Sequence, residues 1–289
     1  MSNLKFITKK PIYKGLSSDK KYRVTTDQGE VYLLRLIPEE KYTNHVEVFH
    51  IQKQLAALGV SMSHPVSYGK CDEGFYALYS WIDGEDAREI IPHLSKSEQY
   101  NYGFEAGKLL KVIHSIQYTK QHSDWESRFN DKIDNKIKIY NDCPYKFKGA
   151  DHFITYLNNN RHLLAKRPQC FQHGDYHIGN MMIEKNKIVI IDFDRYDFGD
   201  PWEEFNRIVW CVQVSPLFAT GLINGYFENE VPMEFWDSLA LYISNNMISS
   251  IPWAIQFGHE EVRNMIDLAK EVLGWYQNMK NTIPTWYIK

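Results

Sequence analysis

The sequence has no long hydrophobic run and no paired cysteines. The segment 1–10 lacks the apolar stretch of a secretion signal, and no apolar run elsewhere approaches the length of a membrane span. The cysteines are widely separated and form no Cys-x-x-Cys pair, so neither a zinc site nor a disulfide framework is indicated. We therefore expect a protein of the reducing cytoplasm with no membrane partner.

An excess of positive charge is also missing. The formal net charge is −3 at pH 7, and lysines and arginines are scattered along the chain. Nucleic-acid-binding proteins usually carry a basic face, so a nucleic acid is not an expected partner. The chain has no internal repeat and no low-complexity segment, and its 289 residues suffice for a sizeable core in two lobes.

The most informative stretch is the decapeptide Phe-Gln-His-Gly-Asp-Tyr-His-Ile-Gly-Asn that ends at Asn180. Two short apolar runs follow it on either side of Lys185-Asn186, which predicts a β-hairpin. A hairpin brings its two ends together. Asp175 and Asn180 are therefore expected on a loop at its mouth, with Asp192 leaving the second strand beside them.

Two carboxylates and an amide in this arrangement resemble the phosphoryl-transfer residues of kinases. There, one Asp accepts the proton of the attacking hydroxyl, while an Asn and a second Asp hold magnesium on the nucleotide phosphates. The spacing from His173 through Asp175 to Asn180 matches the kinase His-Arg-Asp loop, with Gly174 in place of the Arg. Ordinary turn chemistry is the alternative for Asp175 and Asn180, because both residue types are frequent in loops.

The pattern His-Gly-Asp-x-His-x-Gly-Asn, with Ile-Asp-Phe at 191–193 and Gly-Asp-Pro at 199–201, resembles the aminoglycoside phosphotransferase and choline kinase superfamily. The resemblance covers nearly the whole chain and implies a two-lobed, protein-kinase-like α+β fold. Residues 1–83 would form a nucleotide-binding lobe of an antiparallel sheet plus one helix, ending at the hinge. Residues 84–289 would form a larger, mainly helical lobe that carries the catalytic loop and binds the acceptor.

The same resemblance implies roles for the residues of the motif. Asp175 would be the catalytic base, Asn180 and Asp192 would hold Mg²⁺, and His173 would pin the loop as a buried structural histidine. The phosphoryl donor would be ATP or GTP, and the acceptor a hydroxyl group of a small molecule. The sequence indicates neither the choice of nucleotide nor the oligomeric state.

A β-hairpin is expected over 21–26 and 30–37, and Arg35 stands on its second strand, at the position where kinases have a Lys on their third strand. We expect it to pair with Glu47, on a helix predicted from Thr43 to Leu58, and to contact the nucleotide phosphates. Since Arg35 shares its strand face with Leu33, a charge buried there requires a partner. A solvated strand arginine is the alternative.

Two further segments are expected to contact the nucleotide. Ser17 and Ser18 lie where a kinase folds a loop over the phosphates, although the segment is not a Gly-x-Gly-x-x-Gly and a plain surface turn is an equal alternative. Ser80, Trp81 and Ile82 precede the Asp-Gly turn that we interpret as the hinge, and their main chain would contact the adenine ring.

Helical periodicity is expected over 97–116, 125–140 and 150–164, with Gly103 and Gly107 allowing close helix packing. His114 is interpreted as structural. Asp200, before Pro201, is expected to cap a helix. The abundant aromatic residues of the last third are interpreted as core, with a minority, together with Glu260 and Glu261, lining an acceptor cleft.

Three carboxylates are candidate acceptor contacts: Asp194, Glu203 and Glu204. For Glu203 and Glu204 the alternative is a first-turn position that suits the helix macrodipole. Asp194 could instead support the metal site from outside it.

Family frequency favours an aminoglycoside acceptor, which would imply antibiotic resistance. The C-terminal Trp286-Tyr-Ile-Lys lacks the acids that such kinases often place there, which weakens this assignment. A macrolide, a choline-like amine and an amino alcohol are the alternatives. A protein kinase is disfavoured because Ala-Pro-Glu is missing. A catalytically silent nucleotide-binding module, motivated by Arg35 in place of Lys, is the competing class.

Overall fold

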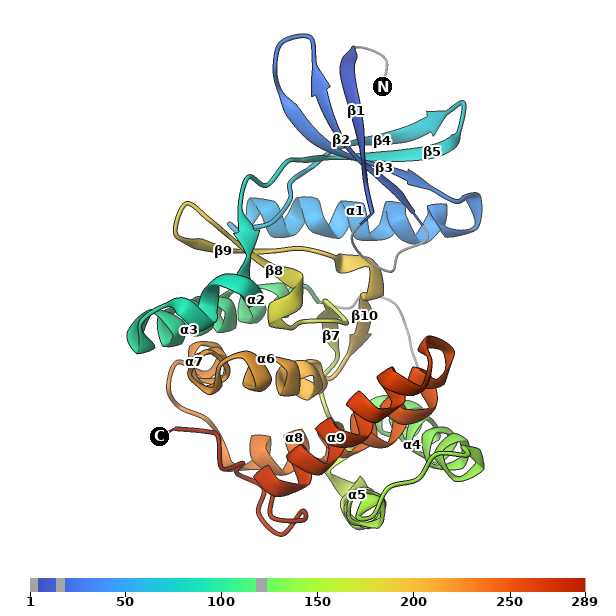
Figure 1. The fold of residues 1–289 in the computed structure, drawn as a ribbon, viewed down its shortest axis with the longest axis vertical. Coiled ribbons are helices and arrows are strands. Elements are labelled where there is room, and N and C mark those ends of the chain that lie inside the picture. Colours follow the sequence, from blue (N-terminus) through green and yellow to red (C-terminus); the bar gives the residue numbers. More distant parts are fainter. Residues whose placement is uncertain (1–4, 14–18, 118–123, 289) are drawn as a thin grey trace. The chain divides into compact units, whose positions relative to one another are not determined.

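The computed structural model describes residues 5–13, 19–117 and 124–288, which fall into two compact units (Figure 1). The first unit comprises Met1–Ile90 and Asn180–Tyr196, and the second comprises Ile91–Gly179 and Asp197–Lys289. The predicted lobe boundary at residue 83 differs from this division. The hairpin after the catalytic loop belongs with the N-terminal segment, because its strands pair with residues of that segment.

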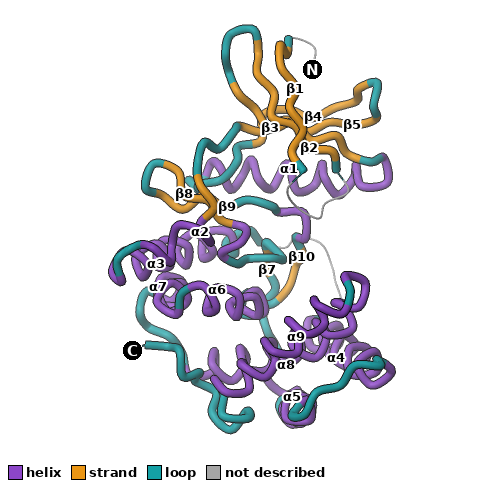
Figure 2. The backbone as a smooth tube through the Cα atoms, viewed as in Figure 1, coloured by secondary structure: helices purple, strands orange, loops and turns teal. Residues whose placement is uncertain are grey.

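Among the described residues, the first unit contains a five-stranded antiparallel sheet in the order β1-β2-β3-β5-β4. Helix α1, Tyr42–Ala57, lies along this sheet (Figure 2). The predicted hairpin and helix are confirmed, whereas β1 was not predicted because a run of lysines and a proline hide its alternation. The strands are β1 Phe6–Ile12, β2 Lys20–Thr26, β3 Val31–Ile37, β4 Pro65–Cys71 and β5 Gly74–Ser80.

The two faces of strand β3 differ in chemistry. Leu34 and Leu36 pack into one apolar cluster, while Ile37 packs with Phe49 of α1 in another. Because side chains alternate along a strand, Arg35 shares the α1 side of the sheet with Ile37. Arg35 is only 7% exposed, so its charge lies within an apolar layer.

A second, three-stranded sheet in the first unit has the order β6-β8-β9 in the described part of the chain. Lys185 and Asn186 both have positive φ angles, 50° and 59°, as a tight hairpin turn of matching twist requires. The Glu184 carboxylate accepts a hydrogen bond from the Asp83 amide at 2.6 Å. The elements are β6 Glu85–Asp86, α2 Ala87–Ile90, β8 Met181–Glu184 and β9 Lys187–Ile190.

The second unit is mainly helical, with a short antiparallel ladder between β7 and β10. Gly103 and Gly107 of α3 face α7 so closely that an added Cβ would overlap the carbonyl oxygens of Phe218 and Leu222. The predicted close packing is therefore confirmed. The helices are α3 Lys96–Ile113, α4 Trp125–Asp142, α5 Ala150–Asn159, α6 Ile208–Val214, α7 Pro216–Phe227, α8 Met233–Ala254 and α9 His259–Trp275; the strands are β7 Cys170–Gln172 and β10 Asp197–Gly199.

Most aromatic residues of the last third are core, as predicted. Phe218, Phe235 and Tyr242 are among the largest fully buried side chains. Trp253 is 40% exposed and lines a cavity of about 530 Å³ with residues of α4, including Ile139. Across the described helices, none combines the length and the apolar run needed to cross a membrane.

Candidate functional site

The predicted catalytic loop joins strand β7 to a 3₁₀ helix over Ile178–Asn180. His173 is fully buried, and its Nδ1 accepts a hydrogen bond from the main-chain amide of Asp175 at 3.3 Å. Between them, Gly174 takes a positive φ of 82°. The buried imidazole thus fixes the loop locally, which confirms the structural role predicted for His173.

Glu204 holds the same loop from a 3₁₀ helix over Glu203–Arg207. Its oxygens accept a hydrogen bond from the Gly174 amide at 3.0 and 3.2 Å, and Oε2 lies 3.7 Å from Nε2 of His114. Burial raises the pKa of Glu204, but His114, His173 and the Gly174 amide outweigh it and hold the pKa below its usual value. Because Glu204 is only 2% exposed, its predicted contact with an acceptor is contradicted. His114 is buried beside Glu204, which confirms the structural role predicted for it.

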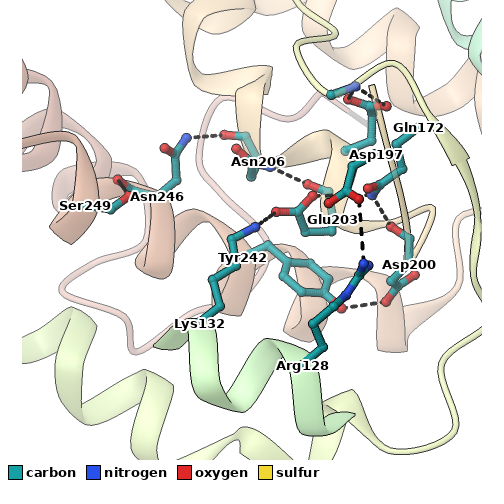
Figure 3. A network of polar contacts seen from close by, with 12 residues as sticks. Arg128, Lys132, Gln172, Asp197, Asp200, Glu203, Asn206, Tyr242, Asn246 and Ser249 are labelled. Carbon is teal, nitrogen blue, oxygen red and sulfur yellow. Dashed lines mark hydrogen bonds and ion pairs between the residues drawn. The ribbon is translucent and has the colours of Figure 1, made fainter. Parts of the chain in front are cut away.

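Figure 3 shows Asp200 within a polar network of the second unit. Asp200 is fully buried and accepts hydrogen bonds from Arg167 Nε at 2.6 Å, from the Tyr242 hydroxyl at 2.5 Å and from the Trp202 amide at 2.9 Å. The predicted capping role is confirmed at the Trp202 amide. The helix expected to start at Pro201 instead begins as the 3₁₀ turn over Glu203–Arg207, and α6 follows it.

Glu203 lies in the same network and already has partners for both carboxylate oxygens (Figure 3). Lys132 Nζ lies 3.1 Å from Oε1, and the Gln172 side-chain amide donates to Oε2 at 3.3 Å. An acceptor ammonium group would have to compete with Lys132 for this carboxylate. The acceptor contact of Glu203 stays a prediction.

The carboxylate of Asp175 lies beside two basic side chains of the second unit. Its Oδ1 is 3.4 Å from Arg207 Nε and 3.5 Å from His177 Nε2. The side chain is 19% exposed, so it is fixed and yet reachable from solvent. A held, accessible carboxylate is suited to accept a proton from a hydroxyl group.

Asn180 and Asp192 belong to the first unit, at the two ends of hairpin β8–β9. The Ile191 amide donates to the Asn180 carbonyl at 3.0 Å, so the hairpin brings the backbones of Asn180 and Asp192 together as predicted. That Asp175 converges with Asn180 and Asp192 on one metal ion and the nucleotide phosphates stays a prediction.

Asp192 adopts a left-handed backbone conformation, with φ 67° and ψ 65°, immediately before a 3₁₀ helix over Phe193–Arg195. For a residue other than glycine this region is uncommon and costs about 1–2 kcal/mol, and such strain persists where the surroundings determine the conformation. The segment after Asp192 must therefore be held in place by its contacts.

Arg35 supplies the first of these contacts. Its Nη1 donates to Asp194 Oδ1 at 2.7 Å, Nη2 binds Asp194 Oδ2, and Nε and Nη2 donate to Asp19 Oδ2 at 3.1 and 2.5 Å. Burial lowers the pKa of Arg35 and raises that of Asp194, but their mutual attraction outweighs burial and shifts both pKa values the opposite way. We call the set of Asp19, Arg35 and Asp194 the arginine clasp, in which Asp19 and Arg35 are buried and Asp194 is partly exposed.

The predicted Arg35–Glu47 pair is not the one that the described residues form. Glu47 Oε2 instead accepts a hydrogen bond from the Tyr196 hydroxyl at 3.2 Å. The physical reason is that Asp19 and Asp194 meet both edges of the planar guanidinium. Asp194 is therefore placed by Arg35, and the segment after Asp192 is tied to β3 through Asp194 and to α1 through Tyr196.

The predicted nucleotide contacts have unequal outcomes. Ser17 and Ser18 lie outside the described residues. Ser80 is the last residue of β5, where its amide donates to the His64 carbonyl at 2.9 Å and its carbonyl accepts from the Ser63 hydroxyl at 2.6 Å. Its main chain thus already has partners in the first unit, and the adenine contact of Ser80 stays a prediction. Trp81 and Ile82 follow outside the strand and stay predictions.

Sequence reasoning missed Asp19, although the hairpin register carried a signal for it. Lys21 pairs with Arg35 across β2 and β3, so Asp19, two residues earlier, lies diagonally on the same face. Arg207, which lies beside Asp175, and Lys136, which interacts with Arg207, were also missed. They lie on separate elements, and no local pattern connects them.

Comparisons with known proteins identify the family and the fold of this chain. The model of the phosphotransferase enzyme family matches residues 9–241. No curated protein sequence matches the chain.

Solved structures similar to this one include a thermostable mutant of aminoglycoside phosphotransferase APH(4)-Ia in ternary complex with AMP-PNP and hygromycin B, with a TM-score of 0.69, 12% identity and 95% of each chain covered. The GDP complex of an aminoglycoside 2'-phosphotransferase-IIIa mutant has a TM-score of 0.67 and 12% identity over 94% of this chain and 93% of that one. The amicoumacin kinase hAmiN has a TM-score of 0.64 and 12% identity over 95% and 90%.

These likenesses confirm the two-lobed, kinase-like α+β fold predicted from the sequence, with an antiparallel sheet in the N-terminal lobe and a helical C-terminal lobe. The family match covers most of the chain. The chain therefore belongs to the phosphotransferase enzyme family.

Proposed function

We propose that this enzyme transfers the γ-phosphate of ATP or GTP to a hydroxyl group of a small molecule. The hydroxyl oxygen forms a bond to the γ-phosphorus as the bond from that phosphorus to the β-phosphate oxygen breaks, and the hydroxyl proton passes to Asp175. The observation that carries the proposal is the loop itself. His173 and Glu204 fix the backbone around Asp175 while leaving its carboxylate reachable.

Asn180 and Asp192 would hold Mg²⁺, which when bound neutralises charge on the phosphates. Their donor set fits, because Mg²⁺ prefers oxygen ligands and is usually bound by one or two carboxylates plus substrate phosphates. Hairpin β8–β9 keeps the two backbones together, and the clasp and Tyr196 hold the segment after Asp192. Trp81 and Ile82 would contact the adenine ring. Solved relatives with ADP, AMP-PNP or GDP bound support a nucleotide donor.

Relatives that bind hygromycin B or gentamicin make an aminoglycoside the first acceptor to test. A macrolide, a choline-like amine and an amino alcohol are the other acceptors to test.

Substitution of the base tests the proposal. Asp175→Asn is expected to lower turnover by about 10²–10⁴-fold and to leave nucleotide binding unchanged, because the side chain serves the proton and not the nucleotide. Asp192→Asn should weaken nucleotide binding only when Mg²⁺ is present. Turnover would be followed by release of nucleoside diphosphate and binding by titration calorimetry.

Asp197→Asn is the matched control. Its carboxylate is exposed, belongs to the same unit as Asp175 and pairs with a different cation, Arg128, at 3.6 Å. It should behave as the unaltered protein. Normal turnover by Asp175→Asn would remove the base assignment.

A silent nucleotide-binding module is the second candidate, favoured by the saturation of Arg35. The clasp uses four of the five guanidinium N–H donors on described carboxylates, which leaves at most one for a phosphate. Nucleotide hydrolysis with Mg²⁺ and no acceptor separates the two candidates. Slow hydrolysis supports the enzyme, whereas tight nucleotide binding with no hydrolysis supports the module.

A further inference from the structure

A group of cations lies on the second unit, where α4 meets the 3₁₀ turn that carries Arg207. Arg207 Nε is 3.4 Å from the Asp175 carboxylate, and its guanidinium also lies over the Trp210 ring at 5.3 Å. Lys136 on α4 is close enough to Lys132 and Arg207 for both to disfavour its charged form. Three positive side chains, Lys132, Lys136 and Arg207, thus gather within one unit.

The two acids that pair with this group, Glu203 and Asp175, leave one positive charge unmatched. Glu203 is occupied by Lys132 at 3.1 Å. Arg207 Nε forms an ion pair with Asp175 at 3.4 Å. Among the described residues, no hydrogen bond or ion pair involves Lys136 or the two Nη atoms of Arg207. Lys136 and Arg207 therefore retain donors that the described part of the chain does not use.

Such an arrangement is costly for folding. Burial, followed by repulsion from Lys132 and Arg207, lowers the pKa of Lys136 to about 8, so the side chain still carries most of its charge at pH 7. A half-buried, unpaired ammonium group is unfavourable unless a counter-ion reaches it. A polycationic acceptor would meet like charge here, which typically costs several kcal/mol.

We infer that the acceptor of this enzyme carries an anionic group, a carboxylate or a phosphate, which Lys136 and Arg207 bind while Asp175 accepts the proton of its hydroxyl. The inference rests on the proposed function and names its substrate class. Arg207 presents a planar fork that suits either oxyanion, and Lys136 supplies a compact charge. Because Arg207 lies 3.4 Å from Asp175, an anionic group bound to Arg207 would lie close to the hydroxyl group that reacts.

Charge-matched acceptors test this inference on the whole protein with ATP, GTP and Mg²⁺. The carboxylate arm is L-homoserine and D-glycerate, and the phosphate arm is ribose 5-phosphate. Glycerol and ribose are the neutral counterparts, and hygromycin B and gentamicin are the cationic arm. We expect diphosphate release above the acceptor-free rate in at least one anionic arm and not with its neutral counterpart.

Substitutions of Lys136 and Arg207 then test whether these residues bind the anionic group of the acceptor. Lys136→Gln and Arg207→Gln should each raise KM for the anionic acceptor by about 10- to 100-fold, because each removes one charged contact. Lys138→Gln is the control, since Lys138 is an exposed lysine on the same helix, two residues further on.

The inference is overturned if a neutral or cationic acceptor is used better than every anionic one. It also fails if hydrolysis proceeds and no anionic compound changes its rate, or if Lys136→Gln and Lys138→Gln have equal KM values. A protein that neither hydrolyses ATP or GTP nor phosphorylates any acceptor refutes the proposed function itself.

Discussion

At the scale of single residues, Lys136 shows a conflict between stability and binding. Its folded pKa of about 8 lies below the usual 10.5, so between these pH values the unfolded chain binds more protons than the folded chain. The free energy of unfolding therefore rises with pH across that window. Burial is the largest cause of the lowered pKa, followed by repulsion from Lys132 on the same helix and Arg207 on the 3₁₀ turn, and Glu203 partly opposes them.

Lys136→Met should consequently raise the free energy of unfolding at pH 7 by about 1 kcal/mol, because an apolar chain of similar length removes the buried charge. The rise in stability between pH 8 and pH 10.5 should become smaller. Urea unfolding at several pH values measures both effects. An unchanged pH slope in the variant would show that another group titrates there.

Glu204 is a residue whose charge stabilises the fold. Its pKa is lowered from the usual 4.5, so its contribution is present above that pH and is lost as the pH falls through the folded value. Glu204→Gln should lower the free energy of unfolding by about 1–3 kcal/mol at pH 7, because the Gly174 amide and His114 lose a charged partner. The difference from the unaltered protein should shrink between pH 5 and pH 3 in chemical unfolding. A difference that is constant with pH would contradict this account.

At the scale of elements, the segment after Asp192 depends on its ties to β3 and α1. Asp194→Asn should lower the free energy of unfolding by about 1–3 kcal/mol, because Arg35 keeps Asp19 but loses one charged partner. It should also raise the Mg²⁺ concentration needed for half-maximal nucleotide binding, since Asp192 is held in a strained conformation by this segment.

Glu73→Gln is the control for the clasp, because its exposed ion pair with Lys9 in the same unit contributes little. Equal Mg²⁺ dependence in the two variants would show that the clasp serves stability alone.

The contact between α3 and α7 depends on glycine. Gly107→Ala should lower the free energy of unfolding by about 1–3 kcal/mol, because the added methyl group overlaps the Leu222 carbonyl and the helices must move apart. Gly274→Ala in α9 is the control, since no atom lies within 4 Å of an added Cβ, and it should be neutral or stabilising. Thermal unfolding of both variants decides the point.

The sequence predicted elements well where a local pattern sets them. The hairpin around Lys185-Asn186, helix α1 and the Gly103–Gly107 face each follow from turn chemistry or periodicity. It failed for the partner of Arg35, because the choice between Glu47, Asp19 and Asp194 depends on where three separate segments meet.

At the scale of the whole molecule, the motifs predicted the fold, but the division into units requires long-range pairing. The first unit is discontinuous. Residues 180–196 pair through β8 with β6, and the Ile190 amide donates to the Ser61 carbonyl at 2.9 Å. The same segment supplies Asp194 to the clasp.

A fragment of residues 1–90 should therefore fail to fold by itself. Without Asp194, Arg35 keeps only Asp19 among its described partners, and β6 loses its neighbour β8. We expect no cooperative thermal transition by circular dichroism and poorly dispersed amide resonances. Co-expression with residues 91–289, which contain the missing segment, should restore both. A fragment that unfolds cooperatively alone would show that β1 to β5 and α1 are self-sufficient, and that residues 180–196 join the first unit for the sake of the site and not of its stability.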